Sequence, residues 1–295
     1  HYMHDHRRLG TGISGLVNCG NTCYINSIIQ ALVHCPPINS FFDSGNYRTR
    51  LNGGEDEAAR LIVEFDKIRT LLWMRNHNVT PKGFIAALIR IARKKNMQEF
   101  VPDNQCDAHE FLVFLSNVFH NAIARPVEMA VNGSPKTDRD KLARRCYLHL
   151  KEQYKSQWSE FIQMFTILSV STISCPVSDT CLSTLPDCSP ILSLPLPSAC
   201  RSLYELLDRY TDMELMTGDD AWHDEANSSY RPVHRRSLFW SLPDIFVIHL
   251  VRWGINLRKS REIVEFPLDS LNMSKYVIGY RPDDFQYRLS AVSYH

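Results

Sequence analysis

One cysteine of this chain is placed where it could act as a nucleophile. Cys23 lies within the stretch GLVNCGNTCYINS, which runs from Gly15 to Ser27. After it, apolar residues recur at helical spacing until Cys35-Pro36-Pro37, where the helix must end because proline has no backbone N–H to donate. The sequence therefore predicts a helix that begins at or just after Cys23.

A thiol at the start of a helix is suited to nucleophilic chemistry. The unpaired N–H groups and the positive end of the helix dipole favour its thiolate form. Gly20 allows the preceding turn to adopt conformations closed to other residues, and Asn18 and Asn21 can direct amide donors at a developing oxyanion. The structural alternative is that Cys23 is a small buried apolar residue beside a helix.

The fixed positions of the string from Gly15 to Leu32, G-L-x-N-x-G-N-T-C-Y-x-N-S-x-x-Q-x-L, decide between these readings. The string resembles the nucleophile segment of the ubiquitin-specific proteases, a family of papain-like cysteine hydrolases. The resemblance implies that Cys23 attacks the isopeptide carbonyl after the last glycine of ubiquitin. It also implies that Asn18 occupies the oxyanion-hole position.

A second segment, NQCDAHEFL from Asn104 to Leu112, predicts the start of another helix. Asp107 can cap this helix and Glu110 can complete a capping box, while His109 is predicted to lie on the helix surface and not to act as a base. The predicted buried face comprises Phe111, Leu112, Leu115, Val118 and Phe119. The segment resembles the family's Q-x-D-A-H-E-F-L motif, which implies that Asp107 and Glu110 bind the basic tail of ubiquitin.

A third segment, from Trp240 to Trp253, predicts a buried strand over Ile245 to Val251, at the centre of a sheet covered on both faces. His249 within it is predicted to be a structural histidine with satisfied hydrogen bonds. The segment resembles the family's palm strand, x-L-P-x-x-L-x-x-x-L-K-R-F, with Val251 in place of the lysine and Trp253 in place of the phenylalanine.

The end of the sequence bears on the catalytic base. Tyr287 to His295 alternates polar and apolar residues, which predicts a strand, and it resembles the family segment that precedes the catalytic histidine. The family's base lies in a later G-G-H-Y motif, followed by an Asp or Asn, and neither occurs in these 295 residues. His295 matches an earlier, non-catalytic histidine, while His1 and Tyr2 are interpreted as remnants of upstream sequence.

Two interpretations of the missing base remain open. The sequence is either a fragment of a longer enzyme or a pseudoenzyme that kept the fold and lost the base. We favour the fragment, because a chain without catalysis would have little reason to keep so complete a nucleophile segment.

Composition and charge exclude several function classes. The chain has 295 residues, 44% of them hydrophobic, which is enough for a large core. Its 33 basic and 32 acidic side chains nearly balance, so we expect no nucleic-acid binding. The nine cysteines are odd in number and scattered, which is typical of a reducing compartment. No apolar run reaches the roughly 18 residues of a membrane span, so we expect a soluble cytoplasmic or nuclear protein that binds no membrane.

The resemblance implies an α/β (α+β) papain-like fold in a single catalytic domain over 1–295, incomplete at its C-terminus. A helical thumb takes about 1–125, strand-rich fingers take mainly 165–240, and a β-sheet palm takes the remainder. Helices are predicted over Glu57 to Trp73, over Pro81 to Ala92 with Thr80 as its cap, and from about Asp140 to Phe165 as one charged helix.

The fingers of this family often hold zinc through two C-x-x-C pairs. Here Cys175 and Cys181 are spaced too widely, and no second pair precedes Trp240, although Cys188 and His223 could in principle join. We therefore expect no metal and no cofactor. A metal- or nucleic-acid-binding protein is the weakest of the function classes considered, because paired spacing and basic clustering are lacking.

These observations predict a thiol-dependent deubiquitinase that acts on ubiquitin and ubiquitinated proteins. Its predicted site comprises Cys23 as nucleophile, Asn18 as oxyanion donor, Asp107 and Glu110 as tail-binding carboxylates, and a histidine beyond His295 as base. The alternative is a non-catalytic ubiquitin-binding module that retains the fold.

Overall fold

The chain divides into two compact units. The computed structural model describes residues 12–52, 56–74, 77–102, 104–197, 200–224, 229–254 and 258–294, so His1, Tyr2 and His295 lie outside the described residues. Unit 1 contains the residues up to Pro126, residues 157–163 and those from Ser290 on; unit 2 contains 127–156 and 164–289. Among the described residues, no helix has the length and apolar character needed to cross a membrane.

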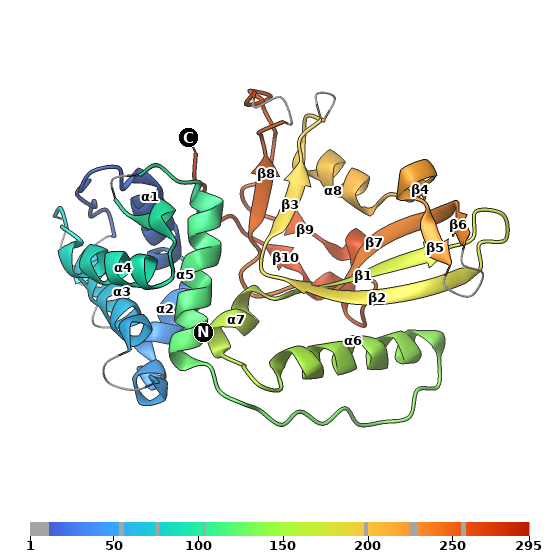
Figure 1. The fold of residues 1–295 in the computed structure, drawn as a ribbon, viewed down its shortest axis with the longest axis horizontal. Helices are drawn as coiled ribbons and strands as arrows, with labels where there is room; N and C mark the ends of the chain where they lie inside the picture. Colours follow the sequence, from blue (N-terminus) through green and yellow to red (C-terminus); the bar gives the residue numbers. More distant parts are fainter. Residues whose placement is uncertain are drawn as a thin grey trace. The chain divides into compact units, whose positions relative to one another are not determined.

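Unit 1 is helical (Figure 1). Its elements are α1 (Cys23–Val33), α2 (Pro36–Asp43), η1 (Asn46–Arg50), α3 (Glu57–Met74), α4 (Lys82–Lys94), η2 (Gln98–Phe100), α5 (Ala108–Ile123) and the beginning of α7 (Glu160–Phe165). The predicted start of α1 at Cys23 is confirmed. The predicted cap of α4 at Thr80 is wrong: Pro81 is the N-cap, because its carbonyl accepts the first helical hydrogen bond from the Ile85 N–H at 2.9 Å.

An aromatic cluster forms the centre of unit 1. The ring of Phe65 lies 5.2 Å from that of Phe42 and 5.1 Å from that of Phe119, and all three side chains are buried. Tilted and edge-to-face pairs of this kind stabilise a core beyond the apolar area that they bury. The predicted buried face of α5, which includes Phe119, is confirmed throughout.

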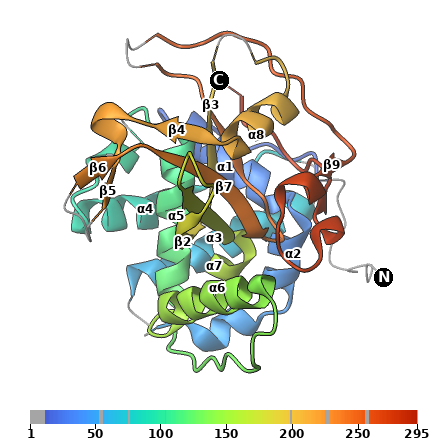
Figure 2. The same ribbon diagram turned by 90° about the vertical axis from the view of Figure 1, so that its right-hand side faces the viewer.

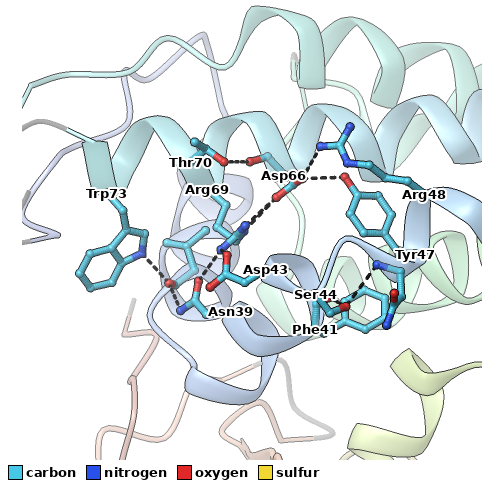
Figure 3. Close-up of polar contacts among 12 residues, drawn as sticks. Asn39, Phe41, Asp43, Ser44, Tyr47, Arg48, Asp66, Arg69, Thr70 and Trp73 are labelled. Carbon is cyan, nitrogen blue, oxygen red and sulfur yellow. Dashed lines mark hydrogen bonds and ion pairs between the residues drawn. The ribbon is translucent and has the colours of Figure 1, made fainter. Parts of the chain in front are cut away.

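A buried ionic network centred on Asp66 joins α1, α2, η1 and α3 (Figure 3). Asp66 Oδ2 accepts hydrogen bonds from Tyr47 Oη at 2.6 Å and Arg48 Nη2 at 2.7 Å. Its Oδ1 accepts from Arg69 Nε at 3.0 Å and from Arg69 Nη2 at 2.8 Å. Arg69 also pairs with Asp43 at 2.6 Å. The pKa of Tyr47 is raised, mainly by burial and next by its hydrogen bond to Asp66. The Tyr47 hydroxyl therefore stays protonated and acts as a donor.

The same network holds the C-terminal end of α1. Arg69 Nη1 donates to Asn39 Oδ1 at 3.2 Å, and Asn39 Nδ2 donates to the Val33 carbonyl at 2.8 Å. Trp73 Nε1 donates to the same carbonyl at 2.9 Å. Since the last carbonyls of a helix have no partner within the helix, these two side chains satisfy the end of the helix that carries Cys23.

The buried His120 is expected to make the stability of the protein depend on pH. It is buried in α5, with Nδ1 2.9 Å from Ser159 Oγ, and burial lowers its pKa below the ordinary 6.5. The unfolded chain therefore binds this proton more readily than the folded chain, and stability is lost as the pH falls below about 6.5. The free energy of unfolding, measured by denaturant titration from pH 7.5 down to 5.5, should fall less in His120→Gln than in the unsubstituted protein. Equal slopes for His120→Gln and the unsubstituted protein would contradict the prediction.

Unit 2 is built around an antiparallel sheet of four strands in the order β2-β1-β7-β4. Its helical elements are α6 (Asp138–Tyr154), α8 (Leu203–Thr211), η3 (Gly218–Asp220), η4 (Ser274–Tyr276) and η5 (Pro282–Asp284). Its strands are β1 (Ile167–Ser174), β2 (Cys181–Ser189), β3 (Leu192–Pro195), β4 (Glu214–Met216), β5 (Trp222–Asp224), β6 (Ser229–Arg231), β7 (Val233–Ser241), β8 (Ile248–Val251), β9 (Leu271–Asn272) and β10 (Gln286–Tyr287).

Two apolar clusters hold unit 2 together. One lies between α6 and the sheet, where Cys146 of α6 packs with Val170 of β1 and Trp240 of β7. The other includes Leu192 and Leu194 of β3, with the half-buried Leu196 packed against them. The β5–β6 hairpin lies at one end of the four-stranded sheet (Figure 2).

The prediction of one continuous charged helix over 140–165 is wrong. The structure has two helices, α6 and α7, because the intervening chain pairs elsewhere. The backbone of Trp158 exchanges two hydrogen bonds of 2.9 Å with Arg125, and this bridge removes residues 156–159 from a helical path.

The predicted central strand over Ile245 to Val251 is shorter and less buried than expected. β8 covers Ile248–Val251, is half-buried along its length and, in the part of the chain that the structure describes, pairs only with β3, in parallel. The Ile245 N–H instead donates to the Met164 carbonyl at 2.9 Å, outside the ladder. His249 Nδ1 lies 3.4 Å from Ser193 Oγ across the β3–β8 pair, in keeping with a hydrogen-bonded structural histidine.

The predicted strand over Tyr287 to His295 is wrong: among its described residues only Tyr287 lies in a strand, at the end of β10 (Gln286–Tyr287). Beyond it the segment makes side-chain contacts to α1 and the turn that ends it. Ser290 Oγ donates to the His34 carbonyl at 3.5 Å, and Ser293 Oγ lies 3.3 Å from Ser27 Oγ. Residues 288–294 are exposed, so alternation of side chains there reflects no buried sheet face.

Candidate active site

Cys23 is the first residue of α1, and its side chain is exposed. The turn before it is held against the segment that precedes α5: the Asn21 N–H donates to the Pro102 carbonyl at 2.8 Å. Gly20 has φ +105, and a Cβ there would lie 3.2 Å from the Pro102 carbonyl oxygen. This residue therefore permits both the left-handed turn and the close approach, as its sequence position predicts.

The Asn18 side chain is fixed at the start of α1 by Thr22, the residue before Cys23. Asn18 Oδ1 accepts from the Thr22 N–H at 3.1 Å and from Thr22 Oγ1 at 2.7 Å. Thr22 Oγ1 in turn accepts from the Cys19 N–H at 3.0 Å. The structure thus brings the predicted oxyanion donor to the same end of α1 as the predicted nucleophile.

Asp107 is the N-cap of α5, where its Oδ1 accepts from the His109 N–H at 2.7 Å. The predicted cap at Asp107 is confirmed, whereas the predicted capping box with Glu110 is not formed. Asp107 and Glu110 are both exposed. The Glu110 carboxylate contacts a thiol, since Cys106 Sγ donates to Glu110 Oε2 at 3.7 Å. The pKa of the Cys106 thiol is raised to about 12, mainly by burial and next by the negative charge of Glu110. Cys106 is therefore a protonated donor, a role that was not predicted from the sequence.

Tyr24 joins the two helix starts. Its ring meets that of Phe111 edge-on at a centroid distance of 5.3 Å, and its side chain is buried. Burial is the main cause of its raised pKa. The segments that carry Cys23 and Cys106 therefore pack together within unit 1.

Known proteins that are similar to this chain define its family. The chain belongs to the ubiquitin carboxyl-terminal hydrolase family, whose family model matches residues 14–295. It is 28% identical to ubiquitin carboxyl-terminal hydrolase 2 of Homo sapiens, over 96% of this chain and 47% of the relative. It is 31% identical to ubiquitin carboxyl-terminal hydrolase Usp2 of Drosophila melanogaster, over 96% of this chain and 30% of the relative. The chain thus spans less than half the length of these two curated relatives.

Solved structures match as well. The SAGA DUB module Ubp8/Sgf11/Sus1/Sgf73 bound to monoubiquitin has a chain 25% identical to this one, with a TM-score of 0.68 over 93% of this chain and 56% of that chain. The same module bound to ubiquitin aldehyde matches with a TM-score of 0.67 and 25% identity, over 93% and 55% of the two chains. The predicted α/β (α+β) fold of this protease family is therefore confirmed.

Residues 165–240 do not fit the zinc site of two C-x-x-C pairs that many members of the family hold, because they contain no such pair. Cys181 pairs with Ser174 across β1 and β2, and Cys175 follows the end of β1. Near the position of the missing second pair, the Asp224 carboxylate pairs with Arg231 at 3.1 Å.

Proposed function

We propose that this protein is a thiol-dependent deubiquitinase that hydrolyses the isopeptide or peptide bond after the C-terminal glycine of ubiquitin. The observation that carries the proposal is the exposed Cys23 at the first position of α1, one residue after the Thr22 that holds Asn18. Membership of the ubiquitin carboxyl-terminal hydrolase family supports it. In this proposal a single domain over 1–295 comprises a thumb (about 1–125), fingers (mainly 165–240) and a palm, in a cytoplasmic or nuclear protein.

The proposed chemistry is acyl transfer through a thioester. The Cys23 sulfur forms a bond to the carbonyl carbon, and the carbonyl oxygen becomes an oxyanion that Asn18 Nδ2 and the N–H groups at the start of α1 stabilise. The C–N bond then breaks, the amine leaves with a proton, and water hydrolyses the thioester to release ubiquitin. Proton transfer in both steps requires a general base and acid, and we assign no described histidine to that role.

The proposed substrate is ubiquitin linked to proteins. Its basic C-terminal tail complements the exposed carboxylates of Asp107 and Glu110 at the start of α5. The alternative function is a ubiquitin-binding module without turnover. Release of a fluorogenic amine from the C-terminus of ubiquitin, lost in Cys23→Ala, supports the enzyme; ubiquitin binding without release supports the module.

Asp107→Asn separates binding from capping. Asparagine caps a helix about as well as aspartate, so the His109 N–H keeps an acceptor and the thermal midpoint should not change. A charge-assisted contact contributes about 1.5–3 kcal/mol, so ubiquitin affinity should fall by roughly one to two powers of ten. Both quantities are to be measured on the same protein. Unchanged affinity would leave Asp107 as a cap alone.

A further inference from the structure

We infer that Thr22 is a positioning residue that fixes the orientation of the Asn18 side-chain amide, so that its NH2 group is presented to the oxyanion. The inference rests on the proposed function and adds a residue to its site. The Thr22 side chain is fully buried, at 0% exposure, and Asn18 is exposed. We therefore take the buried Thr22 as the residue that fixes the position and the exposed Asn18 amide as the group that is positioned.

The orientation of the amide follows from which groups can only donate. The Thr22 backbone N–H has no acceptor capacity, so the atom 3.1 Å from it must be the amide oxygen of Asn18. The Thr22 hydroxyl accepts from the Cys19 N–H at 3.0 Å, which leaves its own hydrogen to donate to the same oxygen at 2.7 Å. A flipped amide would set its NH2 group against two donors and lose both hydrogen bonds.

The Thr22 hydroxyl does not cap α1. Threonine at an N-cap usually accepts from the N–H of the second or third helical residue. Thr22 is the N-cap of α1, yet its side chain makes no such bond within the described structure. Its hydroxyl instead joins the Cys19 backbone to the Asn18 side chain, so its loss should act on the amide more than on the helix.

A fixed amide matters because a catalytic donor is effective when it needs no reorganisation as charge develops. With its oxygen held by Thr22, Asn18 presents only its NH2 group to a substrate. Without the hydroxyl, one hydrogen bond of two remains, and the amide can present its oxygen to the oxyanion, which repels it.

The experiment compares two ligands that differ in one reacting group. Ubiquitin with a C-terminal aldehyde forms a hemithioacetal: the Cys23 sulfur bonds to the aldehyde carbon, the carbonyl π bond opens, and the thiol proton passes to the oxygen. That oxygen occupies the oxyanion position, whereas unmodified ubiquitin reports binding alone. Affinities for both ligands and the thermal midpoint are measured for the unsubstituted protein, Thr22→Val and Thr22→Ser.

Thr22→Val keeps the shape and removes the hydroxyl, so it should weaken aldehyde binding about tenfold, less than the 10²–10³ of a lost oxyanion donor. It should leave the affinity for unmodified ubiquitin unchanged, and Thr22→Ser should restore aldehyde binding. Combined with Asn18→Ala, Thr22→Val should have no further effect, because the amide that it positions is gone.

Two results would overturn the inference while leaving the proposed function intact. One is equal weakening of both ligands by Thr22→Val, and the other is a full additional tenfold loss in the Asn18→Ala background. Either would make Thr22 a structural residue of the turn. A failure of the proposed function is distinguishable, because the aldehyde would then bind Cys23→Ala as tightly as the unsubstituted protein, which removes the basis for both.

Discussion

Cys23→Ala is expected to abolish covalent labelling by a ubiquitin probe that carries a C-terminal electrophile, and to lower hydrolysis of a ubiquitin amide by at least about 10⁴-fold. The reason is positional: Cys23 is exposed at the first residue of α1, where its sulfur is accessible to an electrophile. Labelling is measured by the mass shift of the intact protein on complete conversion.

Cys19→Ala is the matched control, since Cys19 lies four residues away in the same turn. Its thiol contacts the Val17 carbonyl at 3.7 Å, and its contribution to the site is its backbone N–H, which alanine retains. Cys19→Ala should therefore keep most of the labelling. Equal labelling of Cys23→Ala and the unsubstituted protein would remove Cys23 from the proposed site.

Asp66→Ala is expected to destabilise unit 1 by about 3–5 kcal/mol, the range for breaking a buried ion pair by removal of one partner. The Arg69 side chain is only 8% exposed, and without Asp66 its buried positive charge would keep Asp43 as its carboxylate partner (Figure 3). The buried Tyr47 hydroxyl would lose its acceptor as well. The measurement is the free energy of unfolding from denaturant titration.

The control for Asp66→Ala is Lys67→Ala, one residue along the same helix. Lys67 pairs with Glu64 at 2.6 Å, but its side chain is 58% exposed, and surface pairs of this kind contribute at most about 1 kcal/mol. Asp66→Asn, which keeps the size and removes the charge, should fall between the two. A loss below about 1 kcal/mol in Asp66→Ala would show that Asp43 and Asn39 suffice to compensate Arg69.

Local chemistry was enough to place the helix starts of the candidate site. Gly20, the Cys23 helix and the cap at Asp107 follow from residues within a few positions of one another, because helix ends and tight turns are satisfied by near neighbours. The family motifs around these residues gave the fold class, which the structural matches bear out. The roles of Cys23 and Asp107 in catalysis and binding stay predictions.

Only the tertiary structure decided which distant groups pair. The sequence pattern of Ile245 to Val251 gave its apolar character but could not say that β8 would pair with β3 and remain half-buried. The contacts of Asp66 with Tyr47 and of Arg69 with Asp43 join α3 to η1 and α2, which are distant from it in the sequence. Hydrophobic periodicity is local, whereas strand partners and buried ion pairs depend on which segments the folded chain brings together, and that is set by packing across the whole unit.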